Sequence, residues 1–353
     1  MNKFTFSLLV LLMVDISNTF SQSFDGPESV EYDTLNHRWL VSQFNGKKVL
    51  IYSPASGSLT ELATGMTAGP YGIEILGNKL YCCDGSAVKA FDLNTGAAAE
   101  VYELGASFLN GITSDGSENL FVTDFSAMKI YRINITTGSF NVMKSVAPSK
   151  PNGIIYEGEN NRLVFVTWGS VKLVGLSLAD STTTTLLTTS LNNCDGIIRD
   201  QQGDYYISTW GNSALSKIES DFSTQPVTVM SGLSSPADLG INAAGDSIGI
   251  PNSGTANNVV FYPLPIATGL SHTAVKAIQA FPNPSSGIIY LAFDEAVSNG
   301  ELLLIDASGK VCLSQPATGY KFSLHTSGLP NGLYTISLRE NGKEKGRRKV
   351  MVE

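Results

Sequence analysis

The sequence predicts an all-β chain, with a six-bladed β-propeller followed by a small β-sandwich. The main observation is a repeat of about 42 residues that runs from residue 27 to about residue 262. Within it, short β-branched and aromatic segments such as 119–124 and 129–133 are bounded by Gly, Asn and Asp, as strands are. Composition agrees, because only 15% of the 353 residues are charged while 34 are Gly, which is typical of many short strands joined by turns.

The repeat is marked by an anchor in which Pro, Leu or Cys is followed by a variable, a small and an aliphatic residue. Its small residue falls at 29, 72, 111, 153, 196 and 238, so the spacings are 43, 39, 42, 43 and 42. A second, strand-like anchor follows 12 to 15 residues later, and turn segments such as 94–96 and 136–138 separate the rest. A period near 42 also fits paired helices, but no sustained helical period occurs outside the N-terminus, so four-stranded blades are predicted.

Closing the ring is the least specified part of the propeller prediction. The fourth strand of each blade falls just before the next anchor, so residues before Pro27 are expected to complete the last blade. After removal of a leader only residues 22–26 remain for this purpose. We therefore expect any closing strand to be short.

The N-terminus is predicted to be a signal peptide spanning residues 1–21. Lys3 provides the positive charge, residues 4–14 form an apolar stretch too short to cross a membrane, and Thr19-Phe20-Ser21 offers a cleavage site. The alternative is a buried N-terminal strand. No other apolar run approaches the ~20 residues of a spanning helix, so we expect an exported protein with no transmembrane segment.

Charge and side-chain counts exclude several classes of function. The net charge of −8 leaves no basic surface for a nucleic acid. Only three His occur, none of them spaced as a pair, which disfavours a zinc hydrolase and a Ser-His-Asp enzyme. The four Cys do not form a disulfide framework and are expected to be mostly buried thiols, with one pairing left open.

The chain is predicted to form a propeller over residues 22–262, a linker over 263–274 and a separate domain over 275–353. Residues 263–274 contain two Pro and a Thr-Gly turn, after which the repeat stops. Charge divides at nearly the same place, with 13 Lys and Arg against 23 Asp and Glu in residues 22–275, and 9 against 7 in residues 276–353. An acidic propeller favours a cationic or neutral ligand.

The C-terminal domain resembles the sorting domain of type IX secretion cargo along its whole length. The resemblance rests on Phe281-Pro282-Asn283-Pro284, on residues 306–311, on Leu329-Pro330-Asn331-Gly332 and on the terminal 349–352. It implies recognition by the type IX secretion machinery, passage through the periplasm, and release or attachment at the cell surface. The alternative is an ordinary accessory β-domain.

The variable residue of each first anchor is expected to project into the mouth of the central channel. This set comprises Glu28, Tyr71, Asn110, Asn152, Asp195 and Ala237. Carboxylate and amide oxygens converging on one axis are the ligands that Ca²⁺ prefers. The alternative is that Asn and Asp only hydrogen-bond their own backbone in turns.

The propeller region resembles the senescence-marker-protein and gluconolactonase family. The resemblance rests on Pro27-Glu28-Ser29-Val30, Leu109-Asn110-Gly111, Pro151-Asn152-Gly153-Ile154 and Cys194-Asp195-Gly196-Ile197. It implies that Glu28, Asn152 and Asp195 hold a divalent metal, that Asn110 contacts substrate, and that Asp195 serves as the base for an attacking water. The Arg expected two residues before Asn110 is Phe108 in this chain, which argues against a sugar-acid substrate.

Tyr71, Trp168 and Trp210 are candidates for ligand contact at the same mouth. Trp168 and Trp210 occupy equivalent places in successive repeats, where they would form an aromatic wall or, alternatively, pack between blades. Two hypotheses for function stay open at this stage. One is a calcium-dependent, lactonase-like hydrolase, and the other is a non-catalytic propeller that binds a glycan, a peptide or a surface partner.

Overall fold

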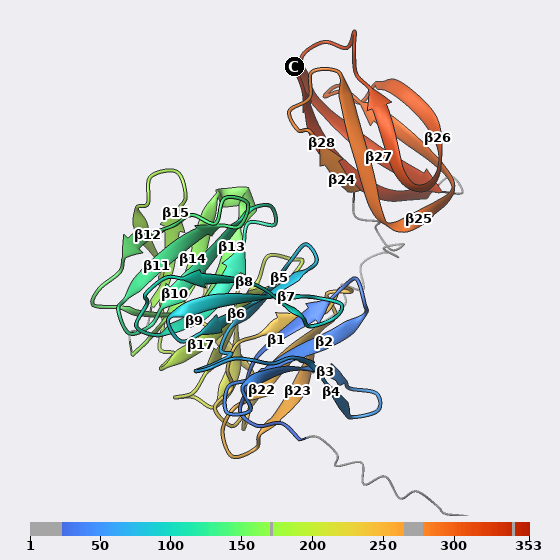
Figure 1. Cartoon of the computed structure of the whole chain (residues 1–353). Coiled ribbons are helices and arrows are strands. Elements are labelled where there is room, and N and C mark those ends of the chain that lie inside the picture. The colour runs from blue at the N-terminus through green and yellow to red at the C-terminus, as the bar shows by residue number, and fades with distance from the viewer. Residues whose placement is uncertain (1–22, 170–171, 265–277, 341–342) are drawn as a thin grey trace, which may run out of the picture. The chain divides into compact units, whose positions relative to one another are not determined.

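The computed structural model describes residues 23–169, 172–264, 278–340 and 343–353, and it confirms an all-β fold (Figure 1). The chain divides into two compact units between residues 265 and 266. The expected signal peptide, residues 1–21, and most of the expected linker lie outside the described residues.

Six antiparallel sheets follow one another in the first unit, and in each sheet the strands pair in chain order. The innermost strands are β1 (Pro27–Asp33), β5 (Ile73–Leu76), β9 (Leu109–Ser114), β13 (Lys150–Glu157), β17 (Cys194–Arg199) and β21 (Gly240–Ile241). The second strands are β2 (Arg38–Gln43), β6 (Lys79–Asp84), β10 (Asn119–Asp124), β14 (Arg162–Trp168), β18 (Tyr205–Thr209) and β22 (Ser247–Asn252).

The outer half of each blade is formed by its third and fourth strands. The third strands are β3 (Lys48–Ser53), β7 (Ala87–Asp92), β11 (Lys129–Asn134), β15 (Lys172–Ser177), β19 (Ala214–Ile218) and β23 (Asn258–Pro263). The fourth strands are β4 (Ser58–Ala63), β8 (Ala98–Glu103), β12 (Phe140–Ser145), β16 (Thr183–Thr188) and β20 (Val227–Ser231). A single 3-10 turn, η1 (Gly158–Asn160), links β13 to β14 within the described chain.

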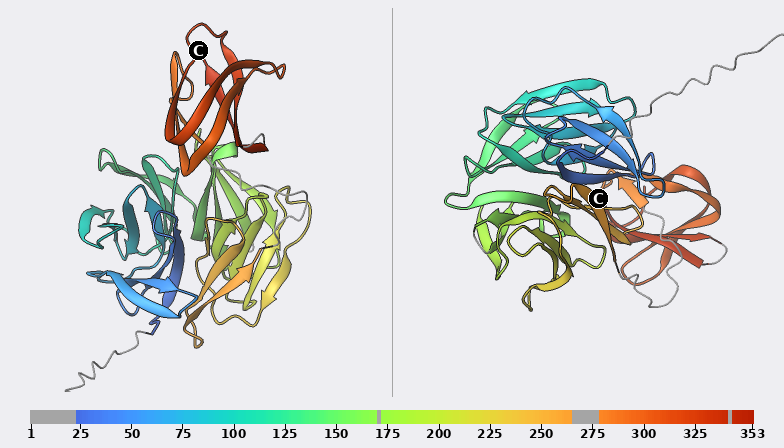
Figure 2. Two further views of the ribbon diagram at one scale, coloured as in Figure 1. Left: turned by 90° about the vertical axis from the view of Figure 1, so that its right-hand side faces the viewer. Right: turned by 90° about the horizontal axis from the view of Figure 1, so that it is seen from below.

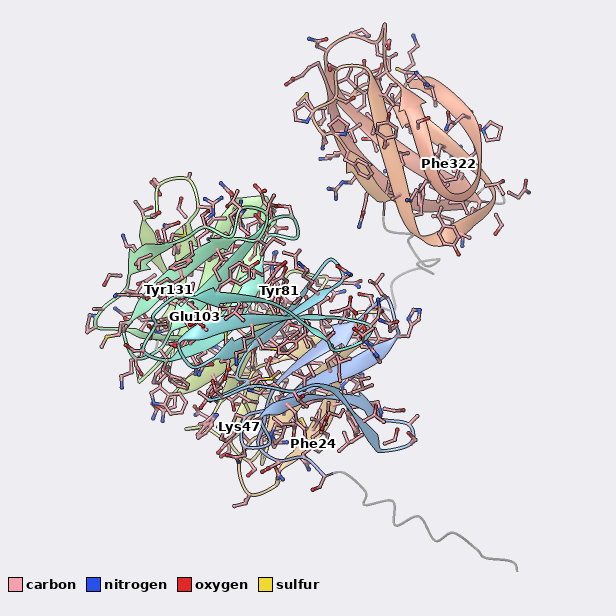
Figure 3. All side chains as sticks on the ribbon, in the orientation of Figure 1. Phe24, Lys47, Tyr81, Glu103, Tyr131 and Phe322 are labelled. Carbon is pink, nitrogen blue, oxygen red and sulfur yellow. The ribbon has the colours of Figure 1, made fainter. Side chains whose placement is uncertain are left out.

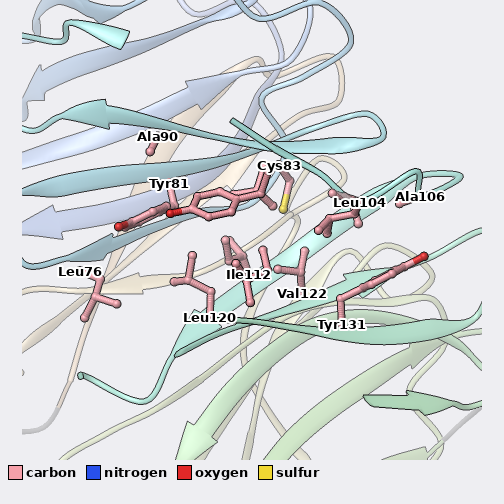
Figure 4. Close-up of a cluster of buried hydrophobic side chains, with 14 residues drawn as sticks. Leu76, Tyr81, Cys83, Ala90, Leu104, Ala106, Ile112, Leu120, Val122 and Tyr131 are labelled. Carbon is pink, nitrogen blue, oxygen red and sulfur yellow. The ribbon is translucent and has the colours of Figure 1, made fainter. Parts of the chain in front are cut away.

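Apolar side chains between adjacent blades form the core of the propeller. Each of the six junctions has its own buried cluster. Figure 4 shows the cluster between the second and third blades, where Tyr81 and Cys83 lie opposite Ile112, Leu120 and Val122. Cys82, Cys83 and Cys194 are buried and Cys312 is partly buried, all four as free thiols, so the expected thiols are confirmed.

The ring closes differently from the sequence prediction. The sixth blade has three strands among the described residues, and residues 23–26 do not form a strand. Instead, Asn257 Oδ1 accepts from the Gly26 amide at 2.9 Å, and Phe24, labelled in Figure 3, packs on Tyr52. Side-chain packing, with the ring centroids of Trp39 in β2 and Phe261 in β23 5.1 Å apart, closes the ring together with a hydrogen bond from the Asp238 amide to the Glu28 carbonyl oxygen. Accordingly, β22 and β23 lie beside β1 and β2 in Figures 1 and 2.

The glycines of the first anchor allow adjacent blades to approach closely at the channel. A Cβ on Gly111 would lie 2.4 Å from the Asn152 carbonyl oxygen, and one on Gly153 would lie 2.5 Å from that of Asp195. Real Cβ atoms do not tolerate such contacts with backbone, so any side chain would push the blades apart. Blade spacing therefore requires glycine at this position in the second to fifth repeats, whereas Ser29 and Asp238 occupy it on the two sides of the closing junction.

The C-terminal unit is a single sheet folded around its own core. Its strands are β24 (Ile278–Phe281), β25 (Ile288–Ile305), β26 (Val311–His325), β27 (Gly332–Glu340) and β28 (Lys343–Val352). The first part of the long β25 pairs with β24 and its last part pairs with β27, while β26 pairs along both. Ile289, Leu304 and Ile336 are fully buried in the core that this sheet encloses.

We predict that Gly153→Ala destabilises the propeller by about 2–3 kcal/mol, because the added methyl group must displace a neighbouring blade. Thermal or urea unfolding of the purified chain measures the change. Gly332→Ala is the control, since a Cβ at Gly332 meets no atom within 4 Å. Equal stability of Gly153→Ala and wild type would show that the blades are not held at this spacing.

Candidate functional site

The predicted site residues are held at the start of the innermost strands by hydrogen bonds between blades. Several of their backbone carbonyls are fixed by the preceding blade: the Gly72 amide donates to Asn110 at 2.9 Å, and the Thr123 hydroxyl donates to Asn152 at 2.9 Å. The Asp238 amide donates to Glu28 at 2.8 Å, which carries the same pattern across the closing junction. These bonds fix the backbone from which the side chains project.

Glu28, Asn152 and Asp195 converge although they come from the first, fourth and fifth blades. Asp195 interacts electrostatically with Glu28, and its carboxylate accepts hydrogen bonds from the side chains of Asn152 and Trp210. All three side chains are nearly inaccessible, with exposed fractions of 6%, 2% and 3%. The structure thus brings together the three residues that sequence analysis selected as metal ligands.

Two oxygen atoms of this group lack a hydrogen-bond partner. They are Asn152 Oδ1 and Asp195 Oδ1, both buried. The Asn152 amide nitrogen points towards the Cys194 carbonyl oxygen at 3.4 Å, which leaves its oxygen free for another ligand. A buried oxygen without a donor is costly, so these two atoms point to a missing electropositive partner.

The buried carboxylates of the site have raised pKa values. Burial raises the pKa of Glu28 from 4.5 to about 7, with a further contribution from Asp238. Burial likewise raises the pKa of Asp238 to about 6, and it raises that of Asp195 well above its usual range, together with Glu28 and Asp238. Within the described chain no Lys or Arg forms an ion pair with them. The site therefore lacks compensating positive charge.

Besides Asp238, sequence analysis missed two further carboxylates, which lie on the channel strands. Glu31 and Glu74 each lie two residues after the small residue of their anchor, so they share its strand face. Burial and the nearby carboxylate of Glu74 raise the pKa of Glu31, and burial raises the pKa of Glu74 to about 7. The Ser114 hydroxyl donates to Glu74 at 2.6 Å. Their common offset within the repeat was the signal available in the sequence.

The remaining predicted residues lie around this group. Burial raises the pKa of the Tyr71 phenol, and the nearby carboxylate of Glu28 raises it further. Asn110 is 7% exposed, and Ala237 is fully buried. Trp168 and Trp210 lie with ring centroids 5.3 Å apart, and Trp210 contacts both Trp168 and the Asp195 carboxylate.

The C-terminal unit matches a known family. Residues 279–353 fit the family described as the secretion system C-terminal sorting domain. The chain therefore ends in a secretion sorting domain. This domain directs the protein to the type IX secretion machinery, and it indicates a secreted or cell-surface protein. In the described part of the chain, no helix has the length and apolar character needed to cross a lipid bilayer.

The propeller resembles solved structures in fold. A gluconolactonase from Xanthomonas campestris superposes with a TM-score of 0.59 at 18% identity, over 69% of this chain and 87% of that one. Regucalcin, a calcium-binding protein from Agrobacterium tumefaciens, gives 0.54 at 15% identity, over 65% and 83%. A Bacteroides thetaiotaomicron protein of unknown function gives 0.58 at 15% identity, over 69% and 70%. No curated protein matches the sequence.

The channel carboxylates predict an unusual dependence of stability on pH. Folded Glu74 keeps its proton up to about pH 7, whereas the unfolded side chain releases it near 4.5. Its contribution to stability is therefore complete below pH 4.5 and is lost as pH rises through 7. We expect Glu74→Gln to stabilise the metal-free propeller at pH 8, by on the order of 2 kcal/mol, and much less at pH 5.

Thermal unfolding at the two pH values checks this prediction. Glu103→Gln serves as the control, because Glu103 is exposed on β8 in the same blade. Equal effects of the two substitutions at pH 8 would contradict the prediction.

Proposed function

We propose that the propeller is a divalent-cation-dependent hydrolase of the lactonase type, exported as cargo of the type IX secretion machinery. The observation that carries this proposal is the pair of buried, unpartnered oxygens on Asn152 and Asp195 beside the Glu28 carboxyl. Hard oxygen donors without a counter-charge fit Ca²⁺. The fold shared with a gluconolactonase and with a calcium-binding regucalcin supports the same conclusion.

Glu28, Asn152 and Asp195 would hold the cation. No group of three or more His, Cys, Asp or Glu side chains in the described chain is arranged to bind a metal. The candidate set fits that finding, because it contains two carboxylates and its third oxygen belongs to an amide. When bound, a Ca²⁺ ion would act as a Lewis acid on the ring carbonyl of a lactone.

The protein's own residues would perform the proton transfer. Asp195 is proposed as the base, because burial makes its ionised carboxylate a stronger proton acceptor than a free one. It would take a proton from water as the water oxygen attacks the ring carbonyl. The ring C–O bond then breaks, and the proton is returned to the leaving oxygen, which yields a hydroxy acid. Asn110 is proposed to hold the substrate from the third blade, and the Trp210 hydrogen bond to orient Asp195.

Calcium titration followed by thermal unfolding tests the cation site. We expect Ca²⁺ to raise the melting temperature of wild type, since a ligand that binds only the folded state stabilises it. Glu28→Gln and Asn152→Leu should lose this increase, whereas Glu61→Gln, an exposed carboxylate on β4, should keep it. No stabilisation of wild type at millimolar Ca²⁺ would overturn the proposed cation site.

A panel of lactones, assayed with and without chelator, tests the activity. We expect hydrolysis that the chelator abolishes and that Asp195→Asn lowers by about two to four orders of magnitude. Calcium binding without hydrolysis of any lactone would instead favour a non-catalytic propeller that binds a glycan, peptide or surface partner.

A further inference from the structure

Six aromatic side chains form a continuous row over the first five blades. Successive ring centroids lie 5.8, 4.6, 5.8, 6.1 and 5.3 Å apart. We call this row the aromatic arc; in order, its members are Phe44, Tyr71, Phe108, Phe125, Trp168 and Trp210. Contacts of this kind fix each ring against the next.

The arc lies at the same end of the propeller as the proposed cation site. Two of its members reach that site: Trp210, at one end, donates to the Asp195 carboxylate, and Tyr71, the second member, lies near enough to Glu28 for the carboxylate to raise its pKa. Between them, Phe108 lies two residues before Asn110. The arc therefore borders the mouth of the channel.

The repeat places several members of the arc at one structural position. Gly111 and Gly196 donate to the hydroxyls of Thr123 and Ser208, each at 2.8 Å, which aligns these hydroxyls between blades. Phe125 and Trp210 each follow two residues later. Ser42, bonded to Ser29 in the same way at 2.8 Å, is followed two residues later by Phe44.

The aromatic side chains stay accessible. None of the six is fully buried, and Trp210 is 37% exposed. By contrast, Tyr81 and Phe121, which are packed between blades, are at most 1% exposed. The arc thus presents apolar surface to a ligand.

Three polar side chains at the ends of the second strands are already occupied by loop amides. Asp84 accepts from the amides of Ala68 and Gly69, both at 2.7 Å. Asp124 accepts from the amides of Ser107, Phe108 and Ala127 at 2.8–3.1 Å. Asn252 accepts from the Ser234 amide at 3.0 Å. These groups shape the loops, so they are not free to bind the hydroxyls of a sugar.

The formal charges at the mouth balance once the proposed divalent cation is bound, so they favour an uncharged ligand. Glu28, Asp195 and Asp238 lie without a paired cation among the described residues. Lys150 lies over the Phe125 ring, 5.4 Å from its centroid, and so stacks on the arc itself. An uncharged ligand with a flat apolar ring fits this surface best.

We infer that the arc selects the substrate of this site, and that the substrate is an uncharged lactone carrying or fused to an aromatic ring. That the substrate is a lactone rests on the proposed lactonase function, whereas the preference for a flat, uncharged aromatic ring rests on the arc. The aromatic part of the substrate lies on Phe108, Phe125 and Trp168, and its carbonyl extends towards Asp195.

Binding is measured separately from turnover with 2-tetralone, in which a CH₂ group replaces the ring oxygen of dihydrocoumarin so that no ester bond can be hydrolysed. We expect Phe125→Ala and Phe108→Ala to weaken 2-tetralone binding by about ten-fold in calorimetry. Phe140→Ala is the matched control, because Phe140 is 44% exposed on the outer strand β12 of the same blade. Phe125→Leu, which keeps an apolar side chain, guards against loss by misfolding and should retain partial binding.

Turnover separates this inference from the proposed function. Asp195→Asn should lose hydrolysis of dihydrocoumarin yet bind 2-tetralone, and wild type should prefer dihydrocoumarin to glucono-δ-lactone in kcat/KM. If wild type hydrolyses no lactone but the arc variants still bind 2-tetralone more weakly than wild type does, the lactonase proposal fails and the aromatic preference stands. If wild type does not bind 2-tetralone, or if Phe125→Ala binds it as well as Phe140→Ala does, the inference about the arc is overturned.

Discussion

The closeness of adjacent blades at the channel is the constraint on which the rest of the propeller depends. Backbone meets backbone there, because each anchor glycine leaves room for the carbonyl of the next blade. Three of these carbonyls, those of Asn110, Asn152 and Ala237, accept hydrogen bonds from an amide or a hydroxyl of the preceding blade. Because this contact recurs around the ring, side chains from distant parts of the sequence are aimed at one axis with little freedom. The site is a direct result of that spacing.

The site places buried carboxylates directly beside apolar aromatic rings. Buried carboxylates with raised pKa values favour either protons or a cation, while the adjacent aromatic rings exclude water and polar groups. Trp210 links the two, since its indole N–H faces Asp195 and its ring extends the row of aromatic side chains. A low-dielectric setting of this kind strengthens every electrostatic interaction within it.

The sequence predicted the blades because their close spacing requires glycine in the anchors of the second to fifth repeats. It predicted the convergence of Glu28, Asn152 and Asp195 because the repeat sets the direction of these side chains. It did not predict the ring closure, which depends on packing between Trp39 and Phe261, over two hundred residues apart. Phe44 and Phe125 were missed because each follows the last residue of its second anchor and so lies outside the repeated motif. Glu31 and Glu74 lay at a repeat position outside the anchors.

In the described chain no strand is shared between the first and last blades, and this mode of closure has a consequence for folding. Each blade is one unbroken stretch of sequence whose strands pair in order, so most backbone pairing is local and can form quickly. Only the last step joins distant ends, and it requires no threading of a terminal strand. A chain that crosses a membrane before reaching its final place can thus assemble blade by blade from its N-terminus and lock its ring at the end.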